Sequence, residues 1–171
     1  MRSTLYLKFI LLYIIVGFLS IFTVSALYSP LVTDYLEKDA AGTLYQSASL
    51  MTTDYLSKYF SEGTSITDVY TQLTGMSSYL QATVWFVEKD GSMIASAHTE
   101  DVTSVPSAIE DFNPAEAGGS QYMTGTYHNY FNEEVITVIT PVTQQFVTKG
   151  YLLIHKPYRA VNELKNFFIQ R

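Results

Sequence analysis

Apolar positions follow three successive patterns along the chain, and each pattern predicts a different kind of segment. Residues 9–28 form an uncharged run whose helix would span roughly 30 Å, the thickness of a bilayer's hydrocarbon core. Over residues 30–60 apolar side chains recur every three or four positions, which predicts a helix of about 45 Å that Gly63 ends. From residue 82 onward the period is that of β-strands.

A shorter helix and five strands make up the rest of the pattern. A capping box at residues 65–68 opens an apolar stripe that predicts a helix to residue 80. Two strands within residues 83–96 are joined by a turn at Lys89-Asp90-Gly91. A polar stretch follows over residues 98–119, with one short helix expected around residues 107–112. After it come three more strands and a final helix, at residues 120–131, 134–144, 151–157 and 158–171.

The connections between the strands predict one antiparallel sheet. Strands three, four and five follow one another as hairpins, and the stretch between strands two and three is long enough to cross over. Strand five then pairs with strand one, which gives the order 2-1-5-4-3. Because helices flank that sheet, the predicted fold class is α+β.

Charges on either side of the apolar run predict its orientation in a membrane. Basic residues precede the run and acidic residues follow it, so the positive-inside rule places residues 1–8 in the cytoplasm and the later part outside. A cleaved signal peptide is the alternative, because residues 24–26 have the small side chains of a cleavage site. The run exceeds the roughly 7–15 apolar residues of a signal peptide, which favours an uncleaved transmembrane helix at residues 9–28.

The composition of the chain after residue 28 limits which partners it is expected to bind and which reactions it is expected to catalyse. That part carries all 16 acidic residues and eight of the 10 basic residues, a net charge of −8, which argues against nucleic acid and anionic membrane surfaces as partners. The chain has no cysteine, so its core forms without disulfides. Its three histidines are isolated in the sequence, and no nucleophile, phosphate-loop or metal-ligand motif accompanies them. We therefore predict no catalytic residue, no metal ligand and no cofactor.

Two stretches of the sequence resemble a known family. Residues 84–97, VWFVEKDGSMIASA, and residues 136–158, ITVITPVTQQFVTKGYLLIHKPY, are similar to the extracytoplasmic sensor region of bacterial membrane-bound sensor histidine kinases. Those regions have a PAS-like fold, named Cache or PDC, with an Asp-Gly hairpin and a last strand that leads into an exit helix. The resemblance implies a sensor domain at residues 29–158 and an exit helix at residues 159–171, leading to a second transmembrane segment.

The resemblance also implies how such a protein would work. Kinases of this family are homodimers in the cell membrane, and their helices pass the state of the sensor to a kinase region and from it to a response regulator. The chain has no phosphoacceptor motif and no ATP site, so it is interpreted as the N-terminal part of a longer receptor. A chemoreceptor, a cyclase and a stand-alone membrane-anchored interaction protein are the alternatives. The stimulus, a small molecule or a protein, stays open.

Aromatic and imidazole side chains are the candidates for a ligand site between the sheet and the polar stretch, because pockets combine apolar linings with a few polar groups. Alternation along the third strand places three of them on one face. The candidates are Trp85, Tyr122, His128, Tyr130 and His155. Packing of the domain's own core is the alternative for each of them. Amino-acid-binding members of the family carry an arginine-containing signature before the sheet that is missing here, which argues against an amino-acid ligand.

Two further sets of residues are expected to act in assembly and in transmission. The helix at residues 30–60 is the expected dimer seam, with packing against its own domain as the alternative. The seam residues are Leu44, Ala48, Met51 and Tyr55. The expected hinge between the last strand and the exit helix is formed by Gly150, Pro157 and Arg159. Proline cannot donate to a sheet and suits a first helical turn, and Lys156 and Arg159 are expected to lie in solvent beside it.

Overall fold

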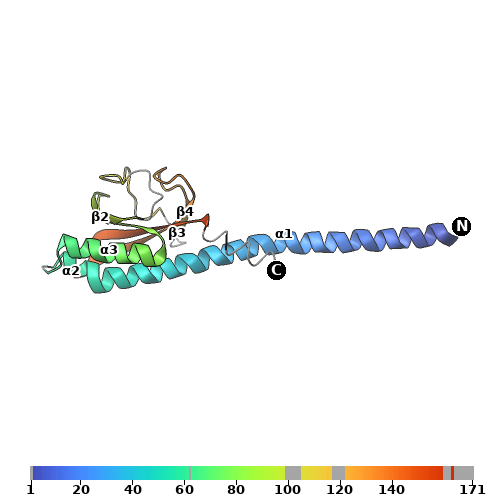
Figure 1. Cartoon of the computed structure of the whole chain (residues 1–171), viewed down its shortest axis with the longest axis horizontal. Coiled ribbons are helices and arrows are strands. Elements are labelled where there is room, and N and C mark those ends of the chain that lie inside the picture. Colours follow the sequence, from blue (N-terminus) through green and yellow to red (C-terminus); the bar gives the residue numbers. More distant parts are fainter. Residues whose placement is uncertain (1, 62, 99–104, 117–121, 160–162, 164–171) are drawn as a thin grey trace.

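The apolar helix at the N-terminus continues without a break into the folded domain. The computed structural model describes residues 2–61, 63–98, 105–116, 122–159 and 163. Its first element, α1 (Arg2–Met51), projects far beyond the rest of the molecule (Figure 1). Pro30 lies inside α1, so the two helical segments predicted on either side of it form one rod. By its length and composition the stretch Tyr6–Val24 could cross a membrane, and its side chains are exposed.

Beyond α1 the chain adds two short helical turns, one longer helix and five strands. A π-helical turn, η1 (Thr52–Leu56), and α2 (Ser57–Tyr59) extend the rod to the end of the predicted long helix. The helix α3 (Ile66–Leu80) begins with the predicted capping box, in which the Asp68 N–H donates to Ser65 Oγ at 3.1 Å. The strands are β1 (Thr83–Glu88), β2 (Met93–Ala97), β3 (Tyr122–Gly125), β4 (Val135–Gln144) and β5 (Val147–Pro157).

The five strands form one antiparallel sheet in the predicted order, β2-β1-β5-β4-β3. The central strand is β5, which pairs with β1 on one side and with β4 on the other. In this register Trp85 lies opposite Leu153, and Leu153 lies opposite Ile139. The α+β class and the pairing of the last strand with the first are therefore confirmed.

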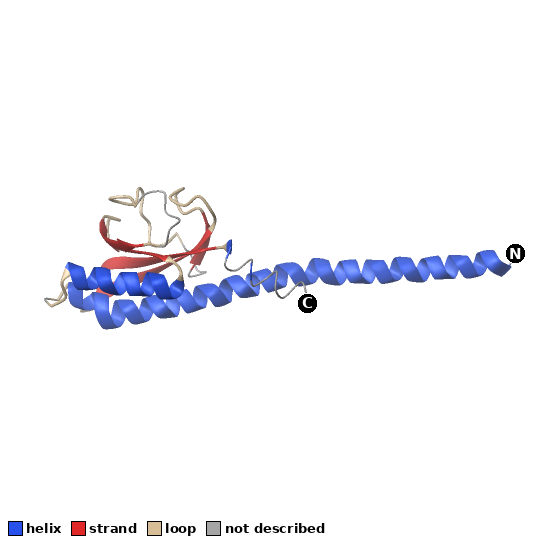
Figure 2. Ribbon diagram, viewed as in Figure 1, coloured by secondary structure: helices blue, strands red, loops and turns tan. Residues whose placement is uncertain are grey.

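The two faces of the sheet are covered by different kinds of structure. Helices α1 and α3 lie along one face, and loops cover the other (Figure 2). The helix face contains a core in which Leu44, Ala48 and Phe86 are fully buried. The loop face contains a second core, with Trp85, Ile109 and Leu153 at its centre. Because strand side chains alternate between faces, Trp85 and Phe86 belong to different cores although they are neighbours in sequence.

The third strand is shorter than the sequence pattern predicts. It ends at Gly125, and the chain then turns through Tyr127, His128 and Asn129, whose φ angles are 36°, 51° and 61°. The expected alternation over residues 120–131 is therefore wrong beyond Gly125. Left-handed backbone is uncommon outside glycine, and of these three residue types only asparagine and histidine are enriched there. The apolar pattern alone does not indicate such a turn.

The hairpin between β4 and β5 is tighter than expected. Its turn consists of Gln145 and Phe146 alone, with φ angles of 49° and 63°, so β5 begins at Val147 rather than after Gly150. Gly150 instead lies inside the strand, where a Cβ would meet the backbone oxygen of Val87 at 2.4 Å. The glycine is thus required by close approach of β1 and not by a turn.

Two other expectations concern segments outside the regular elements. Residues 107–112 form turns and an isolated bridge between Ser92 and Ala108 in place of the expected short helix. Most of the expected exit helix at residues 159–171 lies outside the described residues.

Candidate functional site

A cluster of four rings lies on the loop face of the sheet. Its members are Trp85 from β1, His155 from β5, and Tyr127 and Phe131 from the turn after β3; this set is called the ring cluster below. His155 lies at its centre, with its ring centroid 4.5 Å from that of Trp85, 4.7 Å from Tyr127 and 4.8 Å from Phe131. Trp85 and Phe131 are stacked at 5.6 Å. All four side chains are buried, so the cluster forms one closed aromatic unit against the sheet.

The turn after β3 brings two of these rings onto the sheet. Its left-handed residues reverse the chain, and the Phe131 N–H donates to the Thr126 carbonyl oxygen at 3.3 Å. Tyr127 and Phe131 thereby point inward from a segment that lies next to the sheet edge. Tyr130 contacts the edge of Trp85 at 5.7 Å, and its hydroxyl accepts a hydrogen bond from the Glu110 N–H at 3.4 Å. Tyr130 therefore joins the turn to the loop that carries Ile109.

His155 is held as a neutral ring inside this cluster. Its Nδ1 lies 2.9 Å from Thr137 Oγ1, directly across the strand pair. Burial lowers the pKa of His155 to about 3, so the imidazole is uncharged at neutral pH. Burial, and next the nearby Glu116, raise the pKa of the Tyr127 hydroxyl above its ordinary value, so this group keeps its proton as well.

Three polar atoms of the ring cluster are buried without a hydrogen-bond partner among the described residues. They are Trp85 Nε1, the Tyr127 hydroxyl and His155 Nε2. A fourth such atom, Thr140 Oγ1, lies on the opposite face by strand alternation. Native proteins leave few buried polar groups unpaired, since each one costs about 1–3 kcal/mol. Three such groups on rings that touch one another mark this cluster as the candidate site.

The sequence-based ligand candidates divide between the two faces. Trp85, Tyr130 and His155 lie together on the loop face, as expected. His128 is exposed at the rim, where its Nε2 is 3.0 Å from Glu116 Oε2. Tyr122 packs against the helix-face core, so the structure separates it from the others. The ligand-binding role of these residues stays a prediction.

The sequence pattern did not indicate three residues of the site, which are Tyr127, Phe131 and Thr137. Strand alternation over residues 120–131 predicts that Tyr127 and Phe131 face away from Tyr130, and this prediction is wrong because the chain forms a left-handed turn there. The signal that could have marked the turn is Asn129, a residue type that tolerates such backbone. Thr137 gave no signal of its own, since its contact with His155 depends on the register of β4 and β5.

The junction after β5 is tied to α1 rather than open to solvent. The Tyr158 hydroxyl donates to Glu37 Oε1 of α1 at 2.5 Å, and the Tyr158 N–H donates to the Glu134 carbonyl oxygen at 2.8 Å. Burial, together with Glu37, raises the pKa of Tyr158 to about 12, so its hydroxyl keeps the proton that it donates. The residue that follows β5 is thus hydrogen-bonded to α1, and β5 is the strand that carries His155 into the ring cluster.

The other junction residues depart in part from expectation. Lys156 was expected in solvent, but its Nζ donates to the Leu80 carbonyl oxygen at 3.0 Å at the end of α3, and burial lowers its pKa. Arg159 is exposed, and its Nε is 3.6 Å from Glu133 Oε1. Pro157 is the last residue of β5, whereas Gly150 lies near its opposite end. A hinge at Pro157 and Arg159 stays a prediction, and Gly150 is placed too far along the strand to be part of it.

The expected dimer-seam residues face the chain's own sheet. Leu44 and Ala48 are 1% and 0% exposed, and Met51 and Tyr55 are half-buried against the same core. A dimer seam along α1 stays a prediction. Leu44 and Ala48 offer no exposed surface for it, because both side chains are buried in the domain's own core. A polar substitution at Leu44 would therefore disturb folding before it reported on dimerisation.

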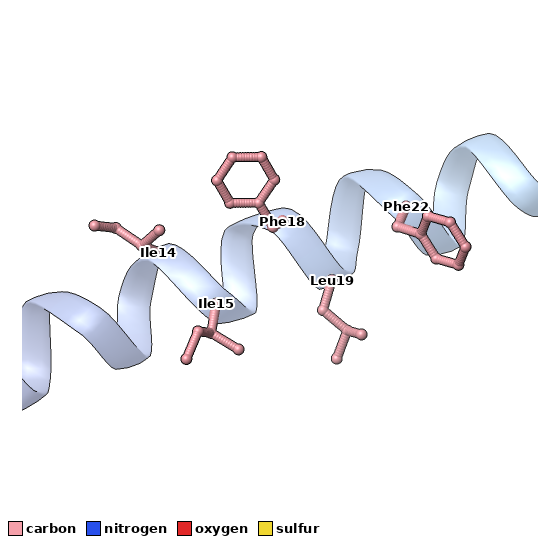
Figure 3. A pocket seen from close by; sticks show the side chains of 5 residues that line it. All are labelled: Ile14, Ile15, Phe18, Leu19 and Phe22. Atoms are coloured by element: carbon pink, nitrogen blue, oxygen red, sulfur yellow. The ribbon is translucent and has the colours of Figure 1, made fainter.

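A shallow hollow on α1 differs in kind from the ring cluster. It is lined by Ile14, Ile15, Phe18, Leu19 and Phe22, all from one exposed stretch of the helix (Figure 3). The side chains in Figure 3 carry no polar group and belong to the segment that could cross a membrane. This surface suits contact with acyl chains, and it offers a polar ligand nothing to bind.

Comparison with solved structures identifies the fold. No protein-family model matches the chain, and no curated protein sequence matches it. The extracellular domain of a proposed histidine kinase, vpHK1S-Z8, matches with a TM-score of 0.56 at 12% identity, over 83% of this chain and 59% of that one. A domain of a proposed sensory box/GGDEF family protein from Vibrio parahaemolyticus matches with a TM-score of 0.56 at 11% identity, over 83% and 62%.

A third match is the ligand-binding domain of the Campylobacter jejuni chemoreceptor Tlp3 in complex with L-valine. It has 19% identity and a TM-score of 0.47, over 84% of this chain and 66% of that one. The chain spans only 59% and 62% of the first two structures, so it corresponds to part of each. The two matches with a TM-score of 0.56 show that the chain has the α+β fold of Cache-like extracellular sensor domains, with one N-terminal apolar helix among the described residues.

Proposed function

We propose that this chain is the extracytoplasmic sensor region of a membrane-bound receptor. The observation that carries the proposal is the continuity of α1, which passes unbroken from Tyr6–Val24, a stretch of membrane-spanning length, into the core beneath the sheet. Ala41, Leu44 and Ala48 of this helix are buried against the domain. A helix held in this way moves with the sheet, so a conformational change of the domain would displace α1 and reach the membrane through that helix.

The central strand, β5, supplies the second half of the proposed connection between the ring cluster and the membrane. β5 carries His155 into the ring cluster, and three residues after His155, just beyond the strand, the Tyr158 hydroxyl donates to Glu37 of α1. A ligand that favours one position of His155 acts on the same strand that is bonded to the rod. Binding at the ring cluster would in this way alter the relation between α1 and the segment after Tyr158.

A sensor histidine kinase is the parent that we favour, acting as a homodimer upstream of a response regulator. The resemblance of residues 84–97 and 136–158 to that family supports this parent, and the histidine-kinase domain shares the fold. A cyclase is the second candidate, because the GGDEF-family domain matches with the same TM-score of 0.56. A chemoreceptor or a stand-alone anchored protein would use the same sensor half.

The proposed orientation is testable by cysteine labelling, because the chain has no cysteine of its own. Ser78→Cys places a thiol on the exposed surface of α3, and Ser3→Cys places one before the apolar stretch. In intact cells a membrane-impermeant maleimide is expected to label the Ser78→Cys protein fully and the Ser3→Cys protein only after lysis. The reverse pattern, or labelling of both thiols in intact cells, would rule out an extracytoplasmic domain behind a single anchor.

The proposed transmission path is testable in a chimaera. Residues 1–171 would replace the matching segment of a histidine kinase that keeps its own second transmembrane helix, and autophosphorylation would be measured in vesicles against a metabolite library. We expect Tyr158→Phe to reduce the ligand-dependent change at least fivefold, because it removes the hydroxyl that bonds Glu37. Tyr79→Phe is the matched control, since Tyr79 is 84% exposed on α3. An undiminished response of the Tyr158→Phe chimaera would remove this hydrogen bond from the path.

A further inference from the structure

The ring cluster combines hydrogen-bonding groups with a lack of buried charge among the residues that the structure describes. On the loop face it packs against Val87, Ile109, Ile139 and Leu153, and the side chain hydrogen-bonded to His155 is the uncharged Thr137. Glu116 acts on the Tyr127 hydroxyl from the adjoining loop, but it is partly exposed and lies 3.0 Å from His128, whose ring centroid is 4.9 Å from that of Tyr127. No lysine, arginine or carboxylate is among the buried residues that the structure describes.

This setting disfavours a charged ligand. An ion that entered the cluster would lose its hydration and find no buried group of opposite charge among the described residues, which is costly in an apolar interior. His155 does not supply a positive charge, because burial keeps the imidazole neutral at ordinary pH. An uncharged molecule avoids that desolvation penalty, and a planar or apolar body would replace the ring contacts that it displaces.

The unpartnered atoms specify what the ligand must carry. Trp85 Nε1 is only a donor, and the Tyr127 hydroxyl both donates and accepts. His155 Nε2 donates when Thr137 donates to Nδ1, and accepts when Nδ1 carries the proton. At least one acceptor on the ligand is therefore required to satisfy the indole N–H.

We propose that the ring cluster binds a small uncharged molecule with a planar or apolar body and a hydrogen-bond acceptor, such as a carbonyl oxygen, to which Trp85 Nε1 donates. This inference rests on the proposed sensor function, because that function is what gives the domain a use for a ligand. Its test measures binding directly and does not depend on the sensor function. The inference gives that function a ligand class, and it separates this domain from sensors that would bind charged metabolites.

The test uses probes of equal shape and different charge. Benzamide, benzoate and benzamidinium form one such set, and acetamide, acetate and acetamidinium form a smaller one. Trp85 is the single tryptophan of the chain, so its fluorescence reports directly on the cluster in the full-length chain in detergent micelles. We expect a saturable change with the uncharged member of at least one set, and at least tenfold weaker binding of both charged members.

A matched pair of variants locates the binding. Tyr127→Phe removes one unpartnered hydroxyl and is expected to weaken binding of the uncharged probe about fivefold, whereas Tyr70→Phe, at a tyrosine that is 54% exposed, is expected to leave it unchanged. Thermal unfolding of both variants followed by circular dichroism identifies any loss of folding, which would otherwise mimic weaker binding.

The results that would overturn this inference differ from those that would overturn the proposed sensor function. Equal binding of a charged member of a set would overturn the ligand class and leave the sensor proposal intact. Absence of any saturable response to both uncharged probes, with ordered water detected beside the Trp85 N–H by nuclear magnetic resonance, would assign the unpartnered atoms to water and overturn the site. Probe binding without any response of the chimaera would instead count against the sensor function.

Discussion

Replacement of Gly150 with alanine is expected to destabilise the domain by about 3 kcal/mol, the upper range for forcing extra atoms into a packed interior. The added Cβ would lie 2.4 Å from the backbone oxygen of Val87 in β1. Since the obstacle is main chain at the centre of the sheet, neither strand is able to yield without loss of its pairing. Denaturant unfolding of the full-length chain in detergent, followed by circular dichroism, measures the change.

Gly75→Ala provides the matched control for this substitution. Gly75 lies exposed in α3, and a Cβ there would meet nothing within 4 Å. Alanine is the better helix former, so this variant is expected to gain about 0.5–1 kcal/mol. If Gly150→Ala proved as stable as the unmodified chain, the close approach of β5 to β1 in this register would be incorrect.

The second large effect is a loss of stability in acid that His155 causes. Burial places the pKa of His155 at about 3 in the folded chain, against an ordinary value of 6.5 that applies when the chain unfolds. Between these two pH values the unfolded state binds a proton that the folded state does not, so the free energy of unfolding falls as the pH falls. The contribution of this residue approaches about 1.4 kcal/mol for each pH unit within the window.

A paired substitution separates this effect from the titration of the carboxylates. His155→Leu combined with Thr137→Val removes both partners of the buried hydrogen bond and leaves apolar groups of similar size. The double variant is expected to lose stability less steeply between pH 6 and pH 4 than the unmodified chain. His98→Gln, at an exposed histidine outside the ring cluster, is the matched control and is expected to retain the full slope. Identical slopes in all three proteins would show that His155 is not protonated on unfolding in this range.

The parts of the fold that could be predicted from sequence are those with strong periodicity. The apolar run, the capping box at Ser65 and the Asp-Gly hairpin each have a local physical cause that the sequence displays. The strand order followed from the lengths of the connections. These features need no knowledge of long-range contacts, which is why the architecture was predicted correctly.

The parts of the site that could not be predicted depend on left-handed backbone and on register. Tyr127 and Phe131 reach the sheet only because three successive residues without glycine adopt positive φ angles, which tertiary packing enforces against local preference. Gly150 looked like a turn residue because glycine serves turns more often than strand contacts. Lys156 looked like a solvated charge, yet the end of α3 offers its ammonium group a carbonyl oxygen.

Alternation along the central strand separates two functions that share one backbone. Tyr151, Leu153 and His155 belong to the loop face, and Leu152 and Ile154 belong to the helix face. In the proposed sensor, substitutions at the first set would change which molecule the domain recognises, while the second set keeps its packing against α1. A receptor of the proposed design would therefore diverge in ligand by point mutation at every second residue of β5, without having to evolve a new connection to the membrane each time.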